Sequence, residues 1–334
     1  MLDELFPPVD APPPDPDTPR AVVSRTSIGD RIYRGILRTA GQSVMVIMGL
    51  IALFLLLRAG QALSKVGLSF LTEQRWQVGT NHFGIAAVLP DGIFIALVAM
   101  AIAIPVSLAT ALYISEYAPK VLRTPLIWLI DLMAAIPSIV YGLWGLFFLQ
   151  PRIIGFCRWL AHHLDFIPLF KVRTGDFAAS YTSSAFIAGV VVSLMVIPII
   201  TSLSREVFSQ TPQSEREAAY ALGSTRWGMV RTVVLPFGRG GMIGATMLGL
   251  GRALGETIAI SLIISPIFTI NFHVLEGGGI SVPALIALHF PEAGDKELSA
   301  LMAAGLVLFA ITLLVNVLAT IMINRSRSGA STAD

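Results

Sequence analysis

Two charged side chains stand inside a long apolar stretch of the sequence. Arg252 and Glu256 lie four residues apart in the segment GRALGET, which ends at Thr257. On a helix this spacing places both side chains on one face. A charge at the centre of a membrane span costs about 2.5–3.5 kcal/mol, so the two residues either form an ion pair that locks helix packing or line a path for a charged solute. We expect the second role, in which Arg252, Glu256 and Thr257 line a path and Arg252 attracts an anion.

A polar stretch between two long apolar segments has the spacing of a docking loop. It reads EREAAYALGSTRWGMVRTVVLP from Glu215 to Pro236 and is too polar to lie in lipid. The Glu-Ala-Ala run predicts a short helix, Gly223 predicts a break, and Pro236 predicts the end of a second helix. Small alanines let another helix approach closely, and arginines offer charged contacts to a partner. The candidate docking residues are Glu217, Ala218, Ala219, Gly223, Arg226, Leu235 and Pro236.

The sequence indicates no chemistry of its own. The nucleotide-binding pattern G-x-x-x-x-G-K-[ST] does not occur in the sequence. The single cysteine, Cys157, excludes an internal disulfide and a cysteine metal cluster. We therefore predict no catalytic residue, no metal ligand and no cofactor bound by the chain. A formal net charge of +2 gives no reason to expect a nucleic-acid partner.

The elements that carry these residues are predicted to lie in a lipid bilayer. Apolar residues make up 54% of the chain and charged residues 13%, with a mean hydropathy of +0.75, whereas a soluble domain carries about 25% charged residues. A helix needs about 20 apolar residues to cross the bilayer. Six segments meet this requirement: 42–63, 92–116, 124–149, 182–203, 238–264 and 299–323. The predicted fold class is an all-α membrane protein with six transmembrane helices.

The remaining segments complete the predicted domain organisation. Residues 1–26 are expected to form a disordered, Pro-rich cytoplasmic tail, residues 27–41 a basic amphipathic segment on the membrane surface, and residues 326–334 a C-terminal tail. The membrane domain, 42–325, contains the polar loop 204–236 on its cytoplasmic side. With the N-terminus inside, fourteen basic residues fall in inner segments and eight in outer segments, a bias that predicts both termini in the cytoplasm.

Several phrases of the sequence resemble a known family. The spacing of the polar loop resembles the coupling loop, or EAA loop, of ABC importer permeases. IPSIVYGLWG (136–145), LGSTRW and GRALGET, together with AIPVSLATALYISEYAP and the C-terminal NVLATIMINRS, resemble permeases of phosphate-specific ABC importers of the PstC type. The resemblance covers about residues 28 to 326, with a mild departure at Val233, where the general importer pattern favours isoleucine. A PstA-type subunit would share the arginine and GET elements, but the long N-terminal region and IPSIVYGLWG favour the PstC type.

The resemblance implies a type I ABC importer permease fold in a multi-pass protein of the bacterial inner membrane. It implies three protein partners: a second, PstA-like permease subunit, a PstB-like ATPase dimer that uses ATP and Mg, and an extracytoplasmic, PstS-like phosphate-binding protein. It also implies phosphate as the substrate, and it assigns Arg252 and Glu256 to the transport path.

Three alternatives remain open on the residues alone. A permease for another oxyanion, such as molybdate or sulfate, would use the same machinery. An ion-driven secondary transporter would usually show internal repeats, of which we find no clear sign, and would leave the polar loop unexplained. A receptor or a membrane scaffold would leave Arg252 and Glu256 inside a span without a purpose.

Overall fold

A computed structural model describes residues 27–77 and 82–327. The tail expected at residues 1–26 lies outside the described residues, and so do residues 328–334 of the expected C-terminal tail. The described chain is helical apart from one two-stranded antiparallel sheet, in which β1 (Trp76–Gln77) pairs with β2 (His82–Phe83). The predicted all-α class is confirmed.

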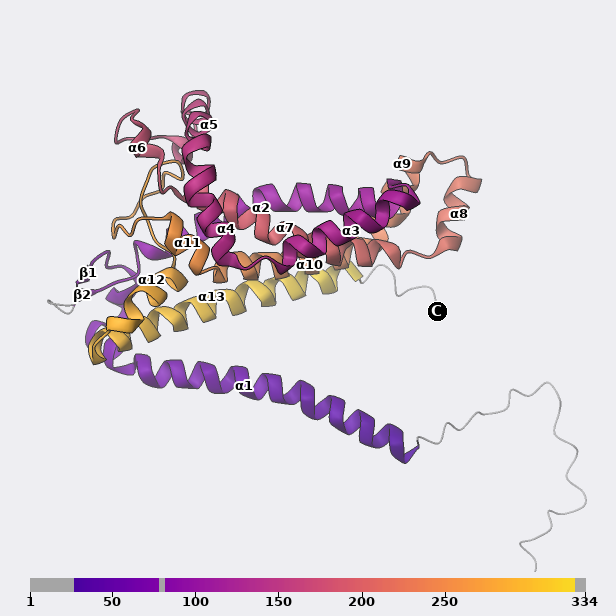
Figure 1. The fold of residues 1–334 in the computed structure, drawn as a ribbon. Helices are drawn as coiled ribbons and strands as arrows, with labels where there is room; N and C mark the ends of the chain where they lie inside the picture. Colours follow the sequence, from indigo (N-terminus) through magenta and orange to yellow (C-terminus); the bar gives the residue numbers. More distant parts are fainter. Residues whose placement is uncertain (1–26, 78–81, 328–334) are drawn as a thin grey trace, which may run out of the picture. The chain divides into compact units, whose positions relative to one another are not determined.

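The helices can be followed along the chain in Figure 1. The α-helices are α1 (Ile28–Val66), α2 (Val88–Leu112), α3 (Lys120–Ala135), α4 (Ser138–Trp144), α5 (Gln150–His163), α6 (Ala178–Tyr181), α7 (Ala185–Ser209), α8 (Gln213–Ala221), α9 (Arg226–Met229), α10 (Leu235–Gly255), α11 (Ile258–Ile263), α12 (Val282–His289) and α13 (Asp295–Arg327). The 3₁₀ turns are η1 (Gly67–Leu71), η4 (Pro168–Phe170) and η6 (Phe290–Glu292), and the π turns are η2 (Tyr113–Tyr117), η3 (Gly145–Leu149) and η5 (Val230–Val234).

Six helical stretches of the described residues are long and apolar enough to cross a membrane, which confirms the predicted number. They are Ile28–Gly60, Val88–Tyr117, Ser138–His163, Ala185–Ser209, Arg226–Gly255 and Asp295–Ile321. Their ends differ from the predicted ends because the helices continue past the apolar residues into polar ones. For example, α7 continues to Ser209, beyond the predicted end at residue 203.

The third predicted span, 124–149, is divided in two. Helix α3 ends at Ala135, and α4 begins at Ser138 after an extended Ile136 and Pro137. A residue that precedes proline is biased away from the helical region, which accounts for the break. From Ser138 the helix continues through η3 and α5, well beyond the predicted end of the span.

The core lies between helices α2, α7, α10 and α13, which pack along one another, while α3 packs against α7 (Figure 1). Small side chains such as Ala96 and Ala99 are fully buried there. Helices α7 and α10 approach closely at Gly249, where an added Cβ would lie 2.7 Å from the Ile200 side chain. At one end of these helices lie α8 and α9, and at the other lie α11, α12 and the two strands (Figure 1).

The chain divides into two compact units, residues 1–51 and 52–334. The described part of the first unit is the beginning of α1, whose side chains from Ile28 to Ile51 are exposed. The segment 27–41, which was predicted to lie on the membrane surface, belongs to this helix, and α1 continues without a break at residue 42.

Candidate functional site

The first half of the polar loop is a short helix that ends at a glycine. After α7 ends, α8 occupies Gln213–Ala221. Gly223 has a φ of +80°, in the left-handed region that favours glycine. The Ser224 N–H donates to the Ala219 carbonyl at 3.1 Å across this turn, which satisfies a carbonyl that the helix end would otherwise leave free. The predicted break at Gly223 is confirmed.

The second half of the loop does not end at Pro236, and this prediction was wrong. The helix that begins at α9 continues through η5 into α10, where Leu235 and Pro236 form the first turn. In the π turn the Leu235 N–H donates to the Val230 carbonyl, five residues back, so the turn is wider than an α-helical turn. A proline has no N–H to donate to the carbonyl four residues before it, and here the π turn provides the backbone hydrogen bond directly before Pro236.

The two alanines of the Glu-Ala-Ala run face different surroundings. Ala219 is buried, whereas Glu217 and Ala218 are exposed. The Glu217 carboxylate accepts a hydrogen bond from Gln213 Nε2 at 3.1 Å, one helical turn earlier. Leu222 is 88% exposed beside them, so α8 presents one acidic and apolar surface while its other face packs on the protein.

Arg226 points back toward the membrane domain. Its guanidinium lies 4.8 Å from the centroid of the Tyr117 ring, and Nη2 donates to the Glu116 carbonyl. Arg226 is exposed beside these contacts, so its expected role as a charged contact for a partner stays a prediction. The sequence analysis did not single out Glu116, which follows Ser115 in the π turn η2 directly after α2.

Arg252 and Glu256 form no ion pair with each other among the described residues. Helix α10 ends at Gly255, and Glu256 has an extended backbone before α11 begins. The Glu256 carboxylate is buried and accepts a hydrogen bond from the Ala259 N–H at 3.3 Å. The spacing that predicted a shared helix face fails because the helix breaks between the two residues.

This break gives the two charges different surroundings. Glu256 lies at the N-terminal end of α11, where the free N–H groups and the helix dipole favour a carboxylate. Thr257 is half-buried, and its hydroxyl donates to the Gly255 carbonyl at 3.1 Å. Arg252 is exposed on the last turn of α10. Within the described chain, its positive charge is not neutralised by Glu256.

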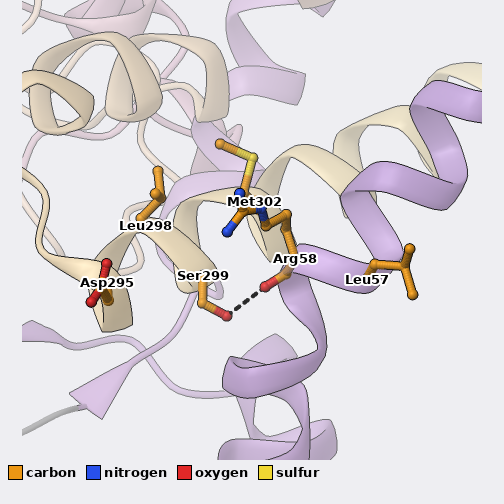
Figure 2. A pocket seen from close by; sticks show the side chains of 6 residues that line it. All are labelled: Leu57, Arg58, Asp295, Leu298, Ser299 and Met302. Carbon is orange, nitrogen blue, oxygen red and sulfur yellow. Dashed lines mark hydrogen bonds between the residues drawn. The ribbon is translucent and has the colours of Figure 1, made fainter.

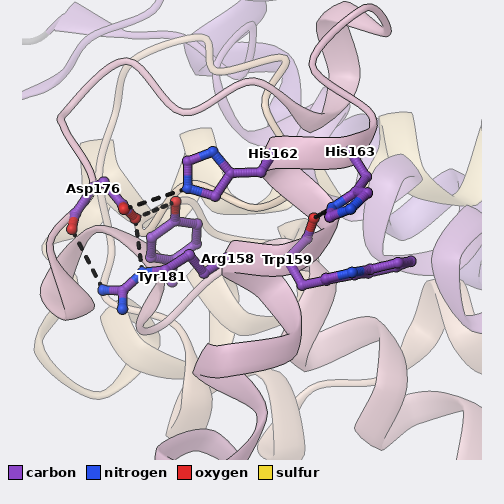
Figure 3. Close-up of polar contacts among 6 residues, drawn as sticks. All are labelled: Arg158, Trp159, His162, His163, Asp176 and Tyr181. Atoms are coloured by element: carbon purple, nitrogen blue, oxygen red, sulfur yellow. Dashed lines mark hydrogen bonds and ion pairs between the residues drawn. The ribbon is translucent and has the colours of Figure 1, made fainter.

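A polar cluster fixes the segment that follows α5 (Figure 3). Helices α5 and α6, which carry most of it, lie at the opposite end of the helix bundle from α8 (Figure 1). The Asp176 carboxylate accepts hydrogen bonds from Arg158 Nε at 2.8 Å and from the Tyr181 hydroxyl at 2.9 Å, and His162 Nε2 lies 3.5 Å away. The adjacent His163 instead stacks on Trp159, with ring centroids 4.5 Å apart. As expected from helix geometry, the two histidines point in different directions.

The cluster shifts two pKa values in opposite directions. The hydrogen bond from Tyr181, followed by the bond and charge of Arg158, holds the pKa of the Asp176 carboxyl below its usual value. Burial and the neighbouring Asp176 raise the pKa of Tyr181 to about 12. Near neutral pH the carboxylate is therefore charged and the tyrosine hydroxyl remains a donor.

A pocket of about 370 Å³ lies between the end of α1 and the start of α13 (Figure 2). Ser299 closes one side of it, because its hydroxyl donates to the Arg58 carbonyl at 2.8 Å and accepts from the Ala62 N–H at 2.9 Å. Arg58 and Asp295 bring both signs of charge to the lining. The pocket therefore has no clear preference for an anion.

A second pocket, of about 330 Å³, lies among the turns that follow α11. His273 and Glu276 line it beside Arg173. Burial lowers the pKa of His273, and neither ring nitrogen has a hydrogen-bond partner among the described residues. Gly278 and Gly279 shape its wall with φ values of +101° and +133°.

Comparison with known proteins identifies the class. Residues 103–328 match the family described as the binding-protein-dependent transport system inner membrane component. The chain is 38% identical over 292 residues to phosphate transport system permease protein PstC 2 of Mycobacterium tuberculosis, covering 86% of this chain and 90% of that protein. It is 39% identical over 314 residues to phosphate transport system permease protein PstC of Xylella fastidiosa, covering 94% and 96%.

A solved structure shares the fold. The crystal structure of a bacterial ABC transporter involved in the import of the acidic polysaccharide alginate superposes with a TM-score of 0.52 at 15% identity, covering 88% of this chain and 99% of that chain. This likeness concerns the fold alone, and it agrees with the type I ABC importer permease fold that the sequence predicted.

The six candidate spans and these similarities define a multi-pass inner-membrane subunit of an ABC importer, which transports and catalyses no reaction itself. The chain belongs to the family of binding-protein-dependent transport system inner membrane components. Membership implies an ATPase and a binding protein as partners, and ATP is hydrolysed by the ATPase rather than by this subunit. The predicted resemblance is confirmed, and the secondary-transporter and scaffold alternatives are excluded.

Proposed function

We propose that this chain is the PstC-type permease subunit of an ATP-driven importer of inorganic phosphate. The observation that carries this proposal is the similarity to permeases of phosphate transport systems, which extends over 94% of the chain at 39% identity. The partners are a PstA-like permease subunit, a PstB-like ATPase dimer and a PstS-like phosphate-binding protein. Both termini lie in the cytoplasm, so that the polar loop faces the ATPase.

The exposed face of α8 is the docking surface for the ATPase. It combines the carboxylate of Glu217 with the exposed side chains of Ala218 and Leu222, while Ala219 holds the other face against the membrane domain. When ATP binding brings the two ATPase subunits together, each docked helix moves with its ATPase. The turn at Gly223 and the continuous helix from α9 into α10 transmit this movement to span five.

Arg252 provides the positive charge of the phosphate path. An anion that enters a region of low dielectric loses its hydration, and a fixed positive group offsets part of that loss. Arg252 suits this role because it is exposed in the isolated subunit and forms no ion pair with Glu256. Glu256 and Thr257 shape the helix break beside it, because their side chains satisfy the Ala259 N–H and the Gly255 carbonyl respectively.

The proposal is tested with the complete complex in proteoliposomes. With ATP inside and the loaded binding protein outside, labelled phosphate should accumulate, and ADP in place of ATP should abolish accumulation. An excess of unlabelled phosphate should compete, whereas sulfate and molybdate should not. Uptake of labelled sulfate or molybdate in place of phosphate would overturn the assignment of substrate and retain the importer.

A further inference from the structure

Glu116 is a buried carboxylate at the end of the second span, and the proposed function has given it no role. It lies in the π turn η2 that follows α2, and its side chain is 3% exposed. One carboxylate oxygen accepts from the Ser115 hydroxyl at 2.8 Å, and the other accepts from Arg216 Nη1 at 2.8 Å. A buried carboxylate is tolerated when it is paired and hydrogen-bonded in this way.

Both helices of the polar loop reach this residue. Arg216 belongs to α8 and also donates from Nη2 to the Phe208 carbonyl, at 2.7 Å, near the end of α7. Arg226 belongs to α9, donates to the Glu116 backbone carbonyl and lies over the ring of Tyr117. Glu116 therefore holds α8 through its side chain and α9 through its backbone.

An apolar cluster beneath these contacts leaves little room for independent movement. Its fully or nearly buried side chains come from α2, α7 and every part of the loop: Ala111, Phe208, Ala219, Met229, Val230 and Val234. The loop and the end of α2 therefore form one packed body. Of its apolar side chains only Ala111 and the partly buried Leu112 come from α2, so the attachment of α2 depends on the polar contacts of Glu116.

Helix α2 connects this body to the far end of the subunit. The helix is continuous through η2 as a single candidate span, Val88–Tyr117. In its first turn the buried Asp91 carboxylate accepts a hydrogen bond from the Ile280 N–H at 3.1 Å. A displacement of the Glu116 end would therefore reach the turn around residue 280.

We propose that Glu116 is a positioning residue that fastens the docking loop to α2, so that movement of the loop displaces span two together with spans four and five. This proposal rests on the coupling role given to the loop under the proposed function, and it does not depend on the identity of the substrate. Glu116→Gln removes the charge that binds Arg216 and leaves the backbone contact to Arg226 in place. The loop should then still dock to the ATPase but move without span two.

Hydrogen exchange in the purified complex, with and without a non-hydrolysable ATP analogue, distinguishes docking of the loop from movement of span two. In the unmodified complex the analogue should change exchange both in α8 and at residues 113–118. In Glu116→Gln the change in α8 should persist, while the change at 113–118 should fall by at least about fivefold, the low end of usual coupling between two sites. Transport per ATP hydrolysed should fall with it. A matched control is Glu206→Gln, which alters an exposed glutamate near the same end of α7.

The reversed pair, Glu116→Arg with Arg216→Glu, should restore the response at 113–118, because it restores the ion pair with opposite polarity. If Glu116→Gln responds as the unmodified complex does in both segments, the proposal is overturned. If neither Glu116→Gln nor the reversed pair assembles with the ATPase, the pair is a folding element and the proposal is equally overturned. A complex that shows the exchange responses but takes up no phosphate would contradict the proposed substrate and leave this inference standing.

Discussion

At the scale of single residues, Arg252 is exposed whereas Glu256 is buried, so we expect different effects when each charge is removed. Arg252→Gln should lower phosphate uptake at least about tenfold, because the path loses its fixed positive charge. The loss should be the same with Glu256→Gln in the background, since the two side chains form no ion pair. Glu256→Gln alone should keep assembly, because an amide oxygen can still accept from the Ala259 N–H. Recovery of uptake in the double variant would restore the ion-pair interpretation.

A second residue-scale prediction concerns pH and the cluster around Asp176. The hydrogen bonds from Tyr181 and Arg158 hold the pKa of Asp176 in the folded protein below its usual value of 3.8, so its stabilising contacts are fully present above that pH and are lost as the pH falls below it. Protection of residues 173–181 from hydrogen exchange, corrected for intrinsic rates, should therefore decline as the pH falls below 3.8.

A substitution tests the same cluster at neutral pH. Asp176→Asn should speed trypsin cleavage after Lys171 and Arg173 by up to about fivefold, the range of an exposed ion pair. Asp165→Asn, at an exposed aspartate of the same segment, is the control and should leave cleavage unchanged. Equal cleavage of the two variants would show that Asp176 does not hold this segment.

Sequence reasoning at this scale could find residues but not their partners. Arg216 was visible as a basic residue of the loop, yet its partner Glu116 stands 100 positions away, and no helical period relates such a pair. For Arg252 and Glu256 the sequence instead predicted a shared helix face that the structure does not contain. Their spacing fitted one helix, but an extended Glu256 between α10 and α11 separates them, and a single apolar segment contains no signal for that break.

At the scale of elements, the turn between α8 and α9 should be sensitive to backbone conformation alone. Gly223 has a φ of +80°, and an added Cβ would meet no atom within 4 Å. Gly223→Ala should therefore destabilise the turn by about 1 kcal/mol through its left-handed backbone only. Gly223→Asn should cost less, since asparagine tolerates that region. Hydrogen exchange of α8 reports the difference, and equal protection in the two variants would exclude a conformational cause.

The exposed surface of α8 gives a second element-scale prediction. Glu217→Lys should reduce co-purification of the ATPase, because it reverses the charge at the proposed docking surface without touching the buried Ala219. Gln213→Ala removes the partner of Glu217 but not its charge, and it serves as the control. The spans should insert normally in both variants. Normal phosphate uptake by Glu217→Lys would count against docking through this surface.

Two prolines account for two of the differences between the predicted and the observed helices. The same residue type breaks the third span at Pro137 and is tolerated at Pro236. Ile136 takes up the extended conformation that a following proline favours, so the span divides. At Pro236 a π turn precedes the proline and widens the helix. The spacing of apolar residues in the sequence does not predict such a turn. The number of spans depended only on length and apolarity, and it was predicted correctly.

At the scale of the whole molecule, the remaining prediction is the orientation of the chain. The bias of fourteen inner to eight outer basic residues predicts that both termini lie in the cytoplasm, on the same side as the proposed docking loop. Reporter domains fused at residues 25 and 330 should both report the cytoplasm, and one fused at residue 218 should agree with them. A fusion at residue 166, beside the Asp176 cluster, should report the opposite side.

The fusions at residues 25 and 330 must report the same side if the number of crossings is even, because an even number of crossings returns the chain to the side from which it started. The number six rests on length and apolarity in the described residues, and the division at Pro137 adds α3 as a short extra helix. If α3 and the stretch Ser138–His163 crossed separately, the count would become seven and the termini would lie on opposite sides. Opposite signals at residues 25 and 330 would therefore identify α3 as an independent crossing. Matching cytoplasmic signals would mean that α3 is not an additional crossing of its own.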